Sequence, residues 1–188
     1  AGIAYTFPDD DAKGSKLTFS DKLESGIPRP GSALPYVDNP NQESEMEFVS
    51  SVRLSYGVRP GAHTIRDHDF RKPSFELFGE APKASGQEAK YEQYHYEPGG
   101  FLVEGGKGGD TPVADDKGVA RHEQGFGKGR AERMLGGARV DRRVVTFDTN
   151  TIDLWPGQIF SIDRHPHSDI TESTKLLVSE FTVEGTPE

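Results

Sequence analysis

Short stretches of alternating apolar and polar residues, each closed by glycine or proline, recur along almost the whole chain. The clearest is "MEFVSSVRLSY", residues 46–56, in which every second side chain, mostly apolar, falls on one face. Such alternation indicates a half-buried strand, because successive side chains of a strand point to opposite faces. With 22 glycines and 13 prolines in 188 residues, the strands must be short and joined by turns. The pattern predicts a mainly β fold with antiparallel strands and one helix, an α+β chain whose strand lengths suit a barrel-like domain.

The first 45 residues differ from the rest. "GIAYTF" and "KLTFSD" alternate on either side of an acidic turn, which predicts a β-hairpin over residues 1–26 that belongs to a preceding subdomain. Residues 27–45 carry four prolines and little periodicity, so we expect a linker there and a barrel-like domain over 46–188. Because Ala1 starts the hairpin without a methionine, we also expect the chain to be a piece of a longer protein.

One long helix is predicted, at about residues 115–138. Val119, Phe126 and Met134 fall near one face at helical spacing, and Asp115 and Asp116 stand where a helix dipole favours negative charge. Five glycines within 125–137 oppose this prediction, since each costs about 1 kcal/mol relative to alanine in a helix. After the helix, three more strands are expected in "RVVTFDT", "GQIFSID" and "KLLVSEFTVEG".

Charge and composition exclude several classes of function. The chain carries 31 Asp and Glu against 22 Lys and Arg, for a net charge of -9, so it lacks the basic surface of a nucleic-acid binder. It has no cysteine, which excludes disulfides and thiolate chemistry. Apolar runs all fall short of the roughly 18 residues of a membrane-spanning helix, so no membrane-spanning segment is expected.

Two glycine-rich stretches invite a comparison with phosphate-binding loops. "GGKGGD" covers residues 105–110 and "GFGKG" covers 125–129, but neither Lys107 nor Lys128 is followed by the Ser or Thr that such loops use to hold magnesium. No nucleotide or other cofactor is therefore expected.

The segment "DRHPHSD" offers a candidate metal site. His165, His167 and Asp169 are spaced by two residues and would share one side of a strand, and their side chains suit zinc, iron or manganese. Pro166 and Ser168 instead favour a polar turn between strands. A metal-dependent hydrolase using these three residues stays open as an alternative function.

A second candidate is the charged run Asp67-His68-Asp69. A carboxylate beside a histidine could serve in general acid-base catalysis, provided that a partner positions it. Arg66, Arg71 and Lys72 are close in sequence, which favours a structural interpretation in which the two acids form local ion pairs. No G-x-S-x-G motif follows a strand.

Three tyrosines, Tyr91, Tyr94 and Tyr96, could form a surface on which sugars stack. Aromatic residues in strands are more often packed, so we do not infer a binding site from them. With no coherent catalytic set in the sequence, we expect a protein that is not an enzyme and has no catalytic, cofactor-binding or metal-binding residues.

The order of five separated segments resembles a known family. "GIAYTF" with "KLTFSD", then "RPGAHTIRDHDFRKPSFEL", "YEQYHYEPGGF", "GRAERML", and finally "PGQIFSIDRHPH" with "KLLVSEF" are similar to segments of the VgrG spike proteins of type VI secretion systems. The resemblance spans nearly all of the chain and covers the latter part of the phage-tail-hub-like module. His68 stands where the family has tyrosine, and the helix is richer in glycine than is usual.

The resemblance implies a structural role. In this family, the hub module forms a homotrimer that links the secretion tube, made of an Hcp-type protein, to the membrane-puncturing spike, whose tip carries effectors. It implies a bacterial protein that is cytoplasmic before firing and is then secreted or injected into a target cell. A phage tail or baseplate hub protein is the nearest alternative.

Overall fold

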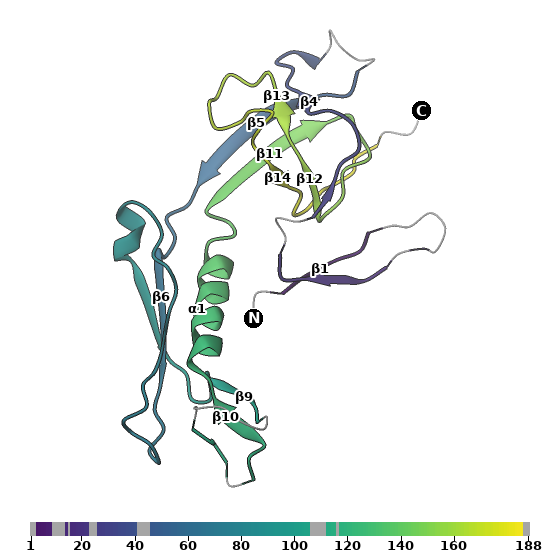
Figure 1. Cartoon of the computed structure of the whole chain (residues 1–188). Coiled ribbons are helices and arrows are strands. Elements are labelled where there is room, and N and C mark those ends of the chain that lie inside the picture. Colours follow the sequence, from purple (N-terminus) through teal and green to yellow (C-terminus); the bar gives the residue numbers. More distant parts are fainter. Residues whose placement is uncertain are drawn as a thin grey trace. The chain divides into compact units, whose positions relative to one another are not determined.

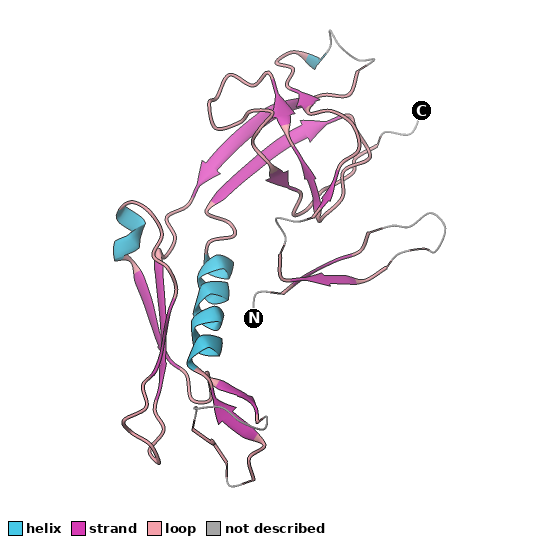
Figure 2. Ribbon diagram, viewed as in Figure 1, coloured by secondary structure: helices cyan, strands magenta, loops and turns pink. Residues whose placement is uncertain are grey.

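The chain folds into two compact units in the computed structural model, which describes residues 3–8, 14, 16–22, 26–40, 46–105, 112–115 and 117–185. Unit 1 covers Tyr56–Val144, and unit 2 covers Ile3–Ser55 and Val145–Glu188. Strands predominate and one long helix, α1, is present among the described residues (Figure 2). Most strand pairs are antiparallel. The predicted mainly β fold with one helix is therefore confirmed.

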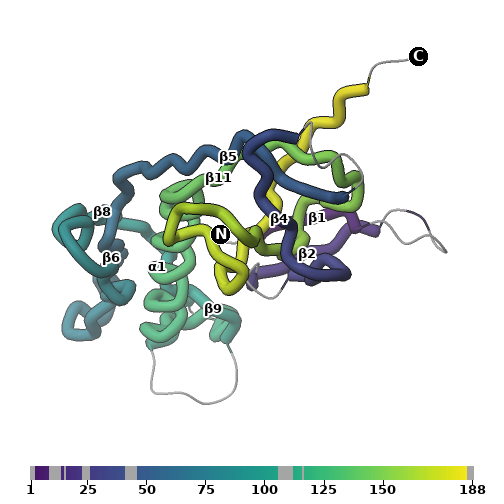
Figure 3. The backbone as a smooth tube through the Cα atoms, turned by 90° about the horizontal axis from the view of Figure 1, so that it is seen from above, coloured from purple at the N-terminus to yellow at the C-terminus, as the bar shows by residue number. Residues whose placement is uncertain are grey.

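Unit 1 is built on a three-stranded sheet in the order β7-β6-β8. The central strand β6 (Ala62–Asp67) pairs antiparallel with β7 (Leu77–Glu80) and parallel with β8 (Glu92–Tyr96). The parallel pair departs from the antiparallel expectation, and it arises because the chain crosses back through the 3-10 helix η3 (Gln87–Lys90) before β8. Helix α1 runs alongside this sheet (Figures 1 and 3) and packs mainly on β7 and β6.

Helix α1 spans Gln124–Ala138, so it begins well after the predicted start near residue 115. Residues before it form β10 (Ala120–His122), which pairs antiparallel with β9 (Leu102–Glu104). Asp115 consequently does not lie at the helix start, and Val119 is exposed. The buried face of α1 consists of Gly127, Ala131 and Leu135, which follow one another at a spacing of four residues.

Glycine brings the helix and the sheet into close contact. A Cβ built on Gly127 would overlap the ring of Phe101, which is fully buried. A Cβ on Gly79 of β7 would lie 2.6 Å from the carbonyl carbon of the same Gly127. Because backbone meets backbone here, Gly127, one of the five glycines that opposed the helix prediction, permits the packing of the helix on the sheet. The core of unit 1 comprises Ile65, Leu77, Ala81, Phe101, Ala131 and Leu135.

Ion pairs hold the C-terminal end of α1 to the 3-10 helix. The carboxylate of Glu88 accepts from Arg139 at 2.7 Å and from Arg142 at 2.8 Å, and these guanidinium groups lower the pKa of Glu88. Arg59 and Asp141 make a further bidentate pair, which lowers the pKa of Asp141. The segments that enter and leave unit 1 are thereby fastened to the same helix end.

Unit 2 is assembled from short strands contributed by both ends of the chain. Two longer strands, β5 (Val49–Tyr56) and β11 (Arg143–Thr149), pair with each other and continue into unit 1 by one or two residues. Strand β12 (Gln158–Phe160) lies between β3 (Ile27–Pro28) and β14 (Leu176–Leu177). Strand β13 (Ile162–Asp163) pairs in parallel with β4 (Leu34–Pro35).

These pairings refine the strands expected from the sequence. The predicted strands over 46–56 and in "RVVTFDT" are confirmed as β5 and β11. The single strand expected in "GQIFSID" is divided at Ser161 into β12 and β13. The strand expected in "KLLVSEFTVEG" was too long, because only Leu176 and Leu177 pair.

A buried arginine joins the segments of unit 2. The Arg29 side chain is 6% exposed, and it donates from Nε to Asp153 at 2.8 Å and from Nη2 to Glu47 at 2.6 Å. Hydrogen bonds from Arg29 and then Thr151 lower the pKa of Glu47. The apolar core of unit 2 comprises Leu34, Val49, Leu154, Phe160, Ile162, Ile170 and Val178.

The predicted N-terminal hairpin is present. Strands β1 (Ala4–Thr6) and β2 (Thr18–Ser20) pair antiparallel, with Tyr5 opposite Phe19. Within 27–45, the expected linker, the described residues form β3 and β4, and Leu34 is 2% exposed. The domain boundaries drawn from the sequence, at 26 and 45, stay a prediction.

Candidate functional site

The charged run Asp67-His68-Asp69 begins at the last residue of β6. Asp67 is 7% exposed, and its carboxylate accepts two backbone hydrogen bonds, from the N–H of His68 at 2.7 Å and from that of Gly99 at 2.8 Å. Gly99 has a φ of 78°, a left-handed conformation that glycine adopts without a steric penalty. The Asp67 carboxylate therefore fastens the end of β6 to the turn that follows β8.

Asp69 is also buried, at 4% exposed, and faces another segment. Its Oδ1 accepts from the backbone N–H of Arg71 at 2.9 Å, which closes a local turn. Its Oδ2 lies 3.5 Å from Nδ1 of His122 in β10, and these two buried atoms have no hydrogen-bond partner among the described residues. With a proton on Nδ1, the imidazole ring faces the carboxylate in an attractive orientation.

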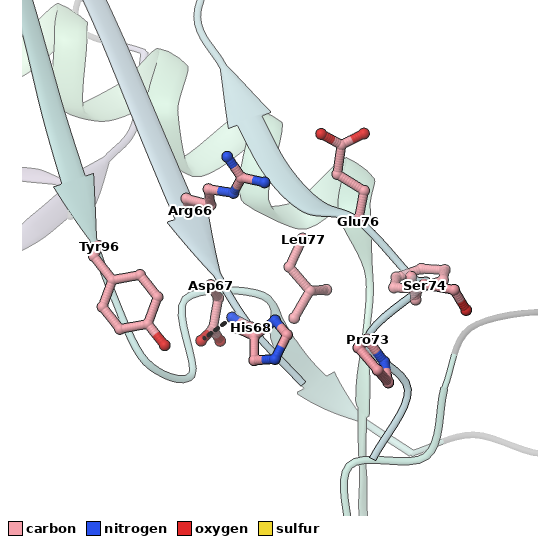
Figure 4. Close-up of a pocket in the computed structure, with 9 residues that line it drawn as sticks. Arg66, Asp67, His68, Pro73, Ser74, Glu76, Leu77 and Tyr96 are labelled. Carbon is pink, nitrogen blue, oxygen red and sulfur yellow. Dashed lines mark hydrogen bonds between the residues drawn. The ribbon is translucent and has the colours of Figure 1, made fainter. Parts of the chain in front are cut away.

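The same stretch lines a pocket of about 220 Å³ (Figure 4). In the close-up, the Asp67 carboxylate turns back onto the backbone of His68, and the rings of His68 and Pro73 lie near each other at one end. The lining residues are Arg66, Asp67, His68, Pro73, Ser74, Phe75, Glu76, Leu77 and Tyr96. The Asp67 carboxylate at this pocket already accepts hydrogen bonds from two backbone N–H groups, so it is poorly placed to act as a general base.

The structural interpretation of Asp67-His68-Asp69 is borne out in part: one of the expected ion pairs, between Asp69 and Arg71, is present, and two further contacts were not foreseen. Of the three basic neighbours proposed from the sequence, Arg71 lies nearest to a carboxylate, with Nε 3.7 Å from Asp69. Two residues distant in sequence also contact this run: the backbone N–H of Gly99 donates to Asp67, and His122 faces Asp69. Sequence reasoning missed both residues, although "EPGG" did mark the turn that contains Gly99.

His165, His167 and Asp169 form a turn. The backbone N–H of His167 donates to Nδ1 of His165, and that of Asp169 donates to Nδ1 of His167, both at 3.1 Å. The His165 ring packs edge-on against Tyr36, and burial, with a smaller effect of His167, lowers the pKa of His165. Each Nδ1 atom is thus occupied by the backbone, as expected for the turn interpretation.

Metal binding gains no support from the described part of the chain. Within residues 3–8, 14, 16–22, 26–40, 46–105, 112–115 and 117–185, no three His, Asp or Glu side chains are grouped closely enough to share a metal ion. The hydrolase alternative therefore has no observation in its favour.

Neither glycine-rich stretch forms a phosphate-binding loop within the described residues. "GFGKG", 125–129, lies inside α1, where Gly127 contacts Phe101. Of "GGKGGD", 105–110, only Gly105 lies within the described residues, so Lys107 falls outside them.

The three tyrosines are exposed, contrary to the expectation that they are packed. Tyr94 and Tyr96 lie on β8 at 55% and 57% exposed, and Tyr91, just before that strand, is 56% exposed. Strand β8 is at an edge of its sheet, so one side of the strand and one row of its side chains are open to solvent.

The five segments that carry the family resemblance meet in two groups. In unit 1, the Asp67 carboxylate joins the second segment to Gly99 of the third, and Phe101 of the third packs on the helix that holds the fourth. In unit 2, Gly157 of "PGQIF" lies against Thr6 of "GIAYTF", and its N–H donates to Val178 of "KLLVSEF". The shared residues are thus those that fix the fold, with backbone contacts in place of a reactive group.

Comparison with known proteins supports the resemblance to a hub protein. The model of the phage tail baseplate hub (GPD) family matches residues 1–187. This chain belongs to that family. The resemblance to VgrG proteins inferred from the five segments is confirmed.

Two relatives from Pseudomonas aeruginosa are similar over most of the chain. The type VI secretion system spike proteins VgrG2a and VgrG2b are each 30% identical to it over 177 residues, which is 89% of this chain. The match covers 18% of VgrG2a and 14% of VgrG2b, so the chain spans less than a fifth of the length of either relative.

No helix among the described residues has the length and apolar character needed to cross a lipid bilayer.

Proposed function

We propose that this chain is a non-enzymatic, structural part of the hub of a contractile injection machine. In this role it would join the secretion tube to the puncturing spike, as in VgrG proteins. The match of the baseplate hub family over residues 1–187 is the observation that carries this proposal. The similarity to two type VI spike proteins favours a secretion system over the alternative, a phage tail.

The geometry of the segments that carry the family resemblance is consistent with a structural role. The buried carboxylates of Asp67 and Asp69 hold backbone turns, and the imidazole rings at 165 and 167 do the same. Each of these side chains closes the backbone turn in which it lies or holds a neighbouring turn, which supports a structural role. The small sheets would belong to the barrel-like subdomains of a hub, completed by parts of the assembly outside this chain.

The proposal extends to partners and location. The natural-length protein would be a homotrimer that binds an Hcp-type tube protein on one side and carries a spike tip or effector on the other. It would stay in the bacterial cytoplasm until firing and then be secreted or injected. These expectations follow from the relatives' role as type VI spike proteins.

A secretion assay tests the proposal. The gene for the natural-length protein is deleted in its host and restored either intact or without residues 1–188, and tube protein in the culture medium is measured by immunoblot. The intact gene should restore tube secretion and the truncated gene should not. Equal secretion by both strains would overturn the hub role, and tube protein recovered only in phage particles would identify a phage tail hub instead.

A further inference from the structure

The edge strand β8 leaves one side of its backbone unpaired. The N–H of Glu97 donates to the carbonyl of Arg66, and the carbonyl of Tyr91 accepts from the N–H of Ala62, so the odd-numbered residues along β8 direct their backbone groups toward β6. The residues between them direct these groups to the other side, where β8 pairs with no strand of the described residues (Figure 3). We call the unpaired groups the free edge: the N–H and C=O groups of Glu92, Tyr94 and Tyr96.

The free edge lacks the features that usually block an edge strand. Natural edge strands are often interrupted by proline or by a β-bulge, or they carry charged side chains, especially lysine. The sequence of β8, EQYHY, has no proline, and apart from histidine its one charged residue is Glu92. Its register with β6 is continuous from Glu92 to Tyr96, so the strand has no bulge. β8 is therefore open to the addition of another strand.

The spacing of the free edge selects an extended polypeptide as its ligand. A parallel strand rises about 3.3 Å per residue, so the unpaired donors and acceptors recur about every 6.6 Å. A second extended backbone offers its own donors and acceptors at the same interval. The side chains of Tyr94 and Tyr96 share one face of the strand and are more than half exposed. Backbone hydrogen bonds would supply affinity, and the two rings would select the side chains that pack on them.

Charge at the two ends of β8 further defines the partner. Glu92 is exposed, and its carboxylate accepts from the hydroxyl of Thr64. At the other end, Arg66 lies opposite Tyr96 on the neighbouring strand (Figure 4). A basic side chain in an added strand is therefore attracted beside Glu92 and repelled beside Tyr96. The net charge of -9 favours the approach of a basic segment and opposes that of a second copy of this chain.

We infer that the free edge of β8 binds an extended, basic segment of a different protein by strand addition. The segment carries alternating β-branched or aromatic side chains that pack on Tyr94 and Tyr96, and a lysine or arginine beside Glu92. This contact does not depend on the proposed hub role, so the two hypotheses hold or fail separately.

Peptide selection tests the inference on the natural-length protein. Random peptides displayed on phage are selected on it, and the dissociation constants of the recovered peptides are measured by fluorescence anisotropy. Tyr94→Pro removes one N–H of the free edge and no hydrogen bond to β6, and it should weaken binding by about tenfold. The matched control, Tyr94→Thr, also lacks the ring but keeps the N–H, and it should weaken binding less. If no selected peptide distinguishes these variants, the inference is wrong.

A second variant tests the charge of the partner without altering the backbone. Glu92→Gln keeps an acceptor for Thr64 and removes the negative charge. The selected peptides should be rich in lysine and arginine, and Glu92→Gln should weaken their binding severalfold at low salt and less at high salt. Peptides that are mainly acidic, or that bind this variant as tightly as the parent, would refute the basic partner.

Residue-resolved hydrogen exchange identifies what covers the free edge. Bound peptide should slow exchange of the amides of Glu92, Tyr94 and Tyr96, with little change at Gln93 and His95, whose N–H groups face β6. Slow exchange of the three outward amides before peptide is added would overturn the inference. Protection that grows with protein concentration would assign the free edge to a second copy, and protection at every concentration would assign it to another part of the same protein.

Discussion

The two units of this chain reach a packed core by different routes. Unit 1 is continuous in sequence, and its helix packs on its sheet through a glycine contact that leaves no room for a side chain. Unit 2 is made from two distant stretches, and each pairing among β3, β4, β12, β13 and β14 joins only two residues of one strand to two of another. Unit 1 therefore joins its helix to its sheet by close packing, whereas unit 2 joins its short strands through both an apolar core and a polar network.

This difference shows how a structural protein can use charged residues to stabilise its fold, with no part in catalysis. In unit 2, Arg29 binds Glu47 and Asp153, and so connects three segments that have few backbone contacts. In unit 1, Asp67 and Asp69 perform a similar task by binding backbone N–H groups at and just beyond the end of the central strand β6. Because the partners are remote in sequence, such networks can stabilise a fold that short strands alone would leave weak.

The largest expected effect is at the glycine contact of unit 1. Gly127→Ala forces a methyl group into the ring of the buried Phe101, and overpacking of this kind costs about 1–3 kcal/mol. Hydrogen exchange measured by mass spectrometry should show faster exchange in Tyr56–Val144 and little change in unit 2. The control is Gly136→Ala, where the new methyl group meets nothing within 4 Å and should stabilise α1 by about 0.5–1 kcal/mol. Equal effects of the two substitutions would contradict the packing argument.

The next effect should be confined to unit 2. Arg29→Met keeps most of the side-chain volume and removes the bonds to Glu47 and Asp153, with an expected loss of about 1–2 kcal/mol, because both carboxylates are partly exposed to solvent. Denaturant unfolding followed by hydrogen exchange should locate the loss in Ile3–Ser55 and Val145–Glu188. Arg53→Met, at an exposed position of β5, is the matched control and should change stability little. Loss of protection in unit 1 as well would show that the two units do not unfold separately.

A smaller effect is expected at the turn that Asp67 holds. Asp67→Asn leaves one acceptor oxygen for two backbone donors, and the free energy of unfolding should fall by about 1 kcal/mol. Exchange of the Gly99 amide should accelerate before that of the core of β6. Glu76→Gln, which alters an exposed carboxylate of the same pocket, should leave both unchanged. If the two variants behave alike, the Asp67 carboxylate does not fasten this turn.

The smallest expected effect is a dependence of the stability of unit 1 on pH. Burial, and to a smaller extent the charge of the stacked His95, lowers the pKa of His63 below its ordinary value of 6.5, while Gln93 and Glu97 act in the opposite direction. The unfolded chain therefore binds this proton first, so unit 1 should lose stability as the pH falls from 6.5 toward the lower pKa of the folded state. His63→Gln should reduce the slope of stability against pH in that window. An unchanged slope would show that His63 does not cause it.

The sequence was most informative where one local pattern dominates. Alternation predicted β5, β11 and the β1/β2 hairpin, because period-two patterning reflects which side of a strand is buried. It failed at the start of α1, since the residues before Gln124 satisfy their backbone groups by pairing with β9 instead of extending the helix. It also missed His122, because its contact with Asp69 depends on the crossing of β10 near the end of β6.

The amino-acid sequence by itself determined the class of the fold, the family and the structural character of Asp67-His68-Asp69. These follow from local alternation, from turn residues and from the order of five segments, all of which are visible in the sequence. Only the tertiary structure decided that Gly127 meets Phe101 and that Asp67 binds Gly99. The physical reason is that these features depend on which distant segments meet, and a pattern along one strand or helix does not specify its partner.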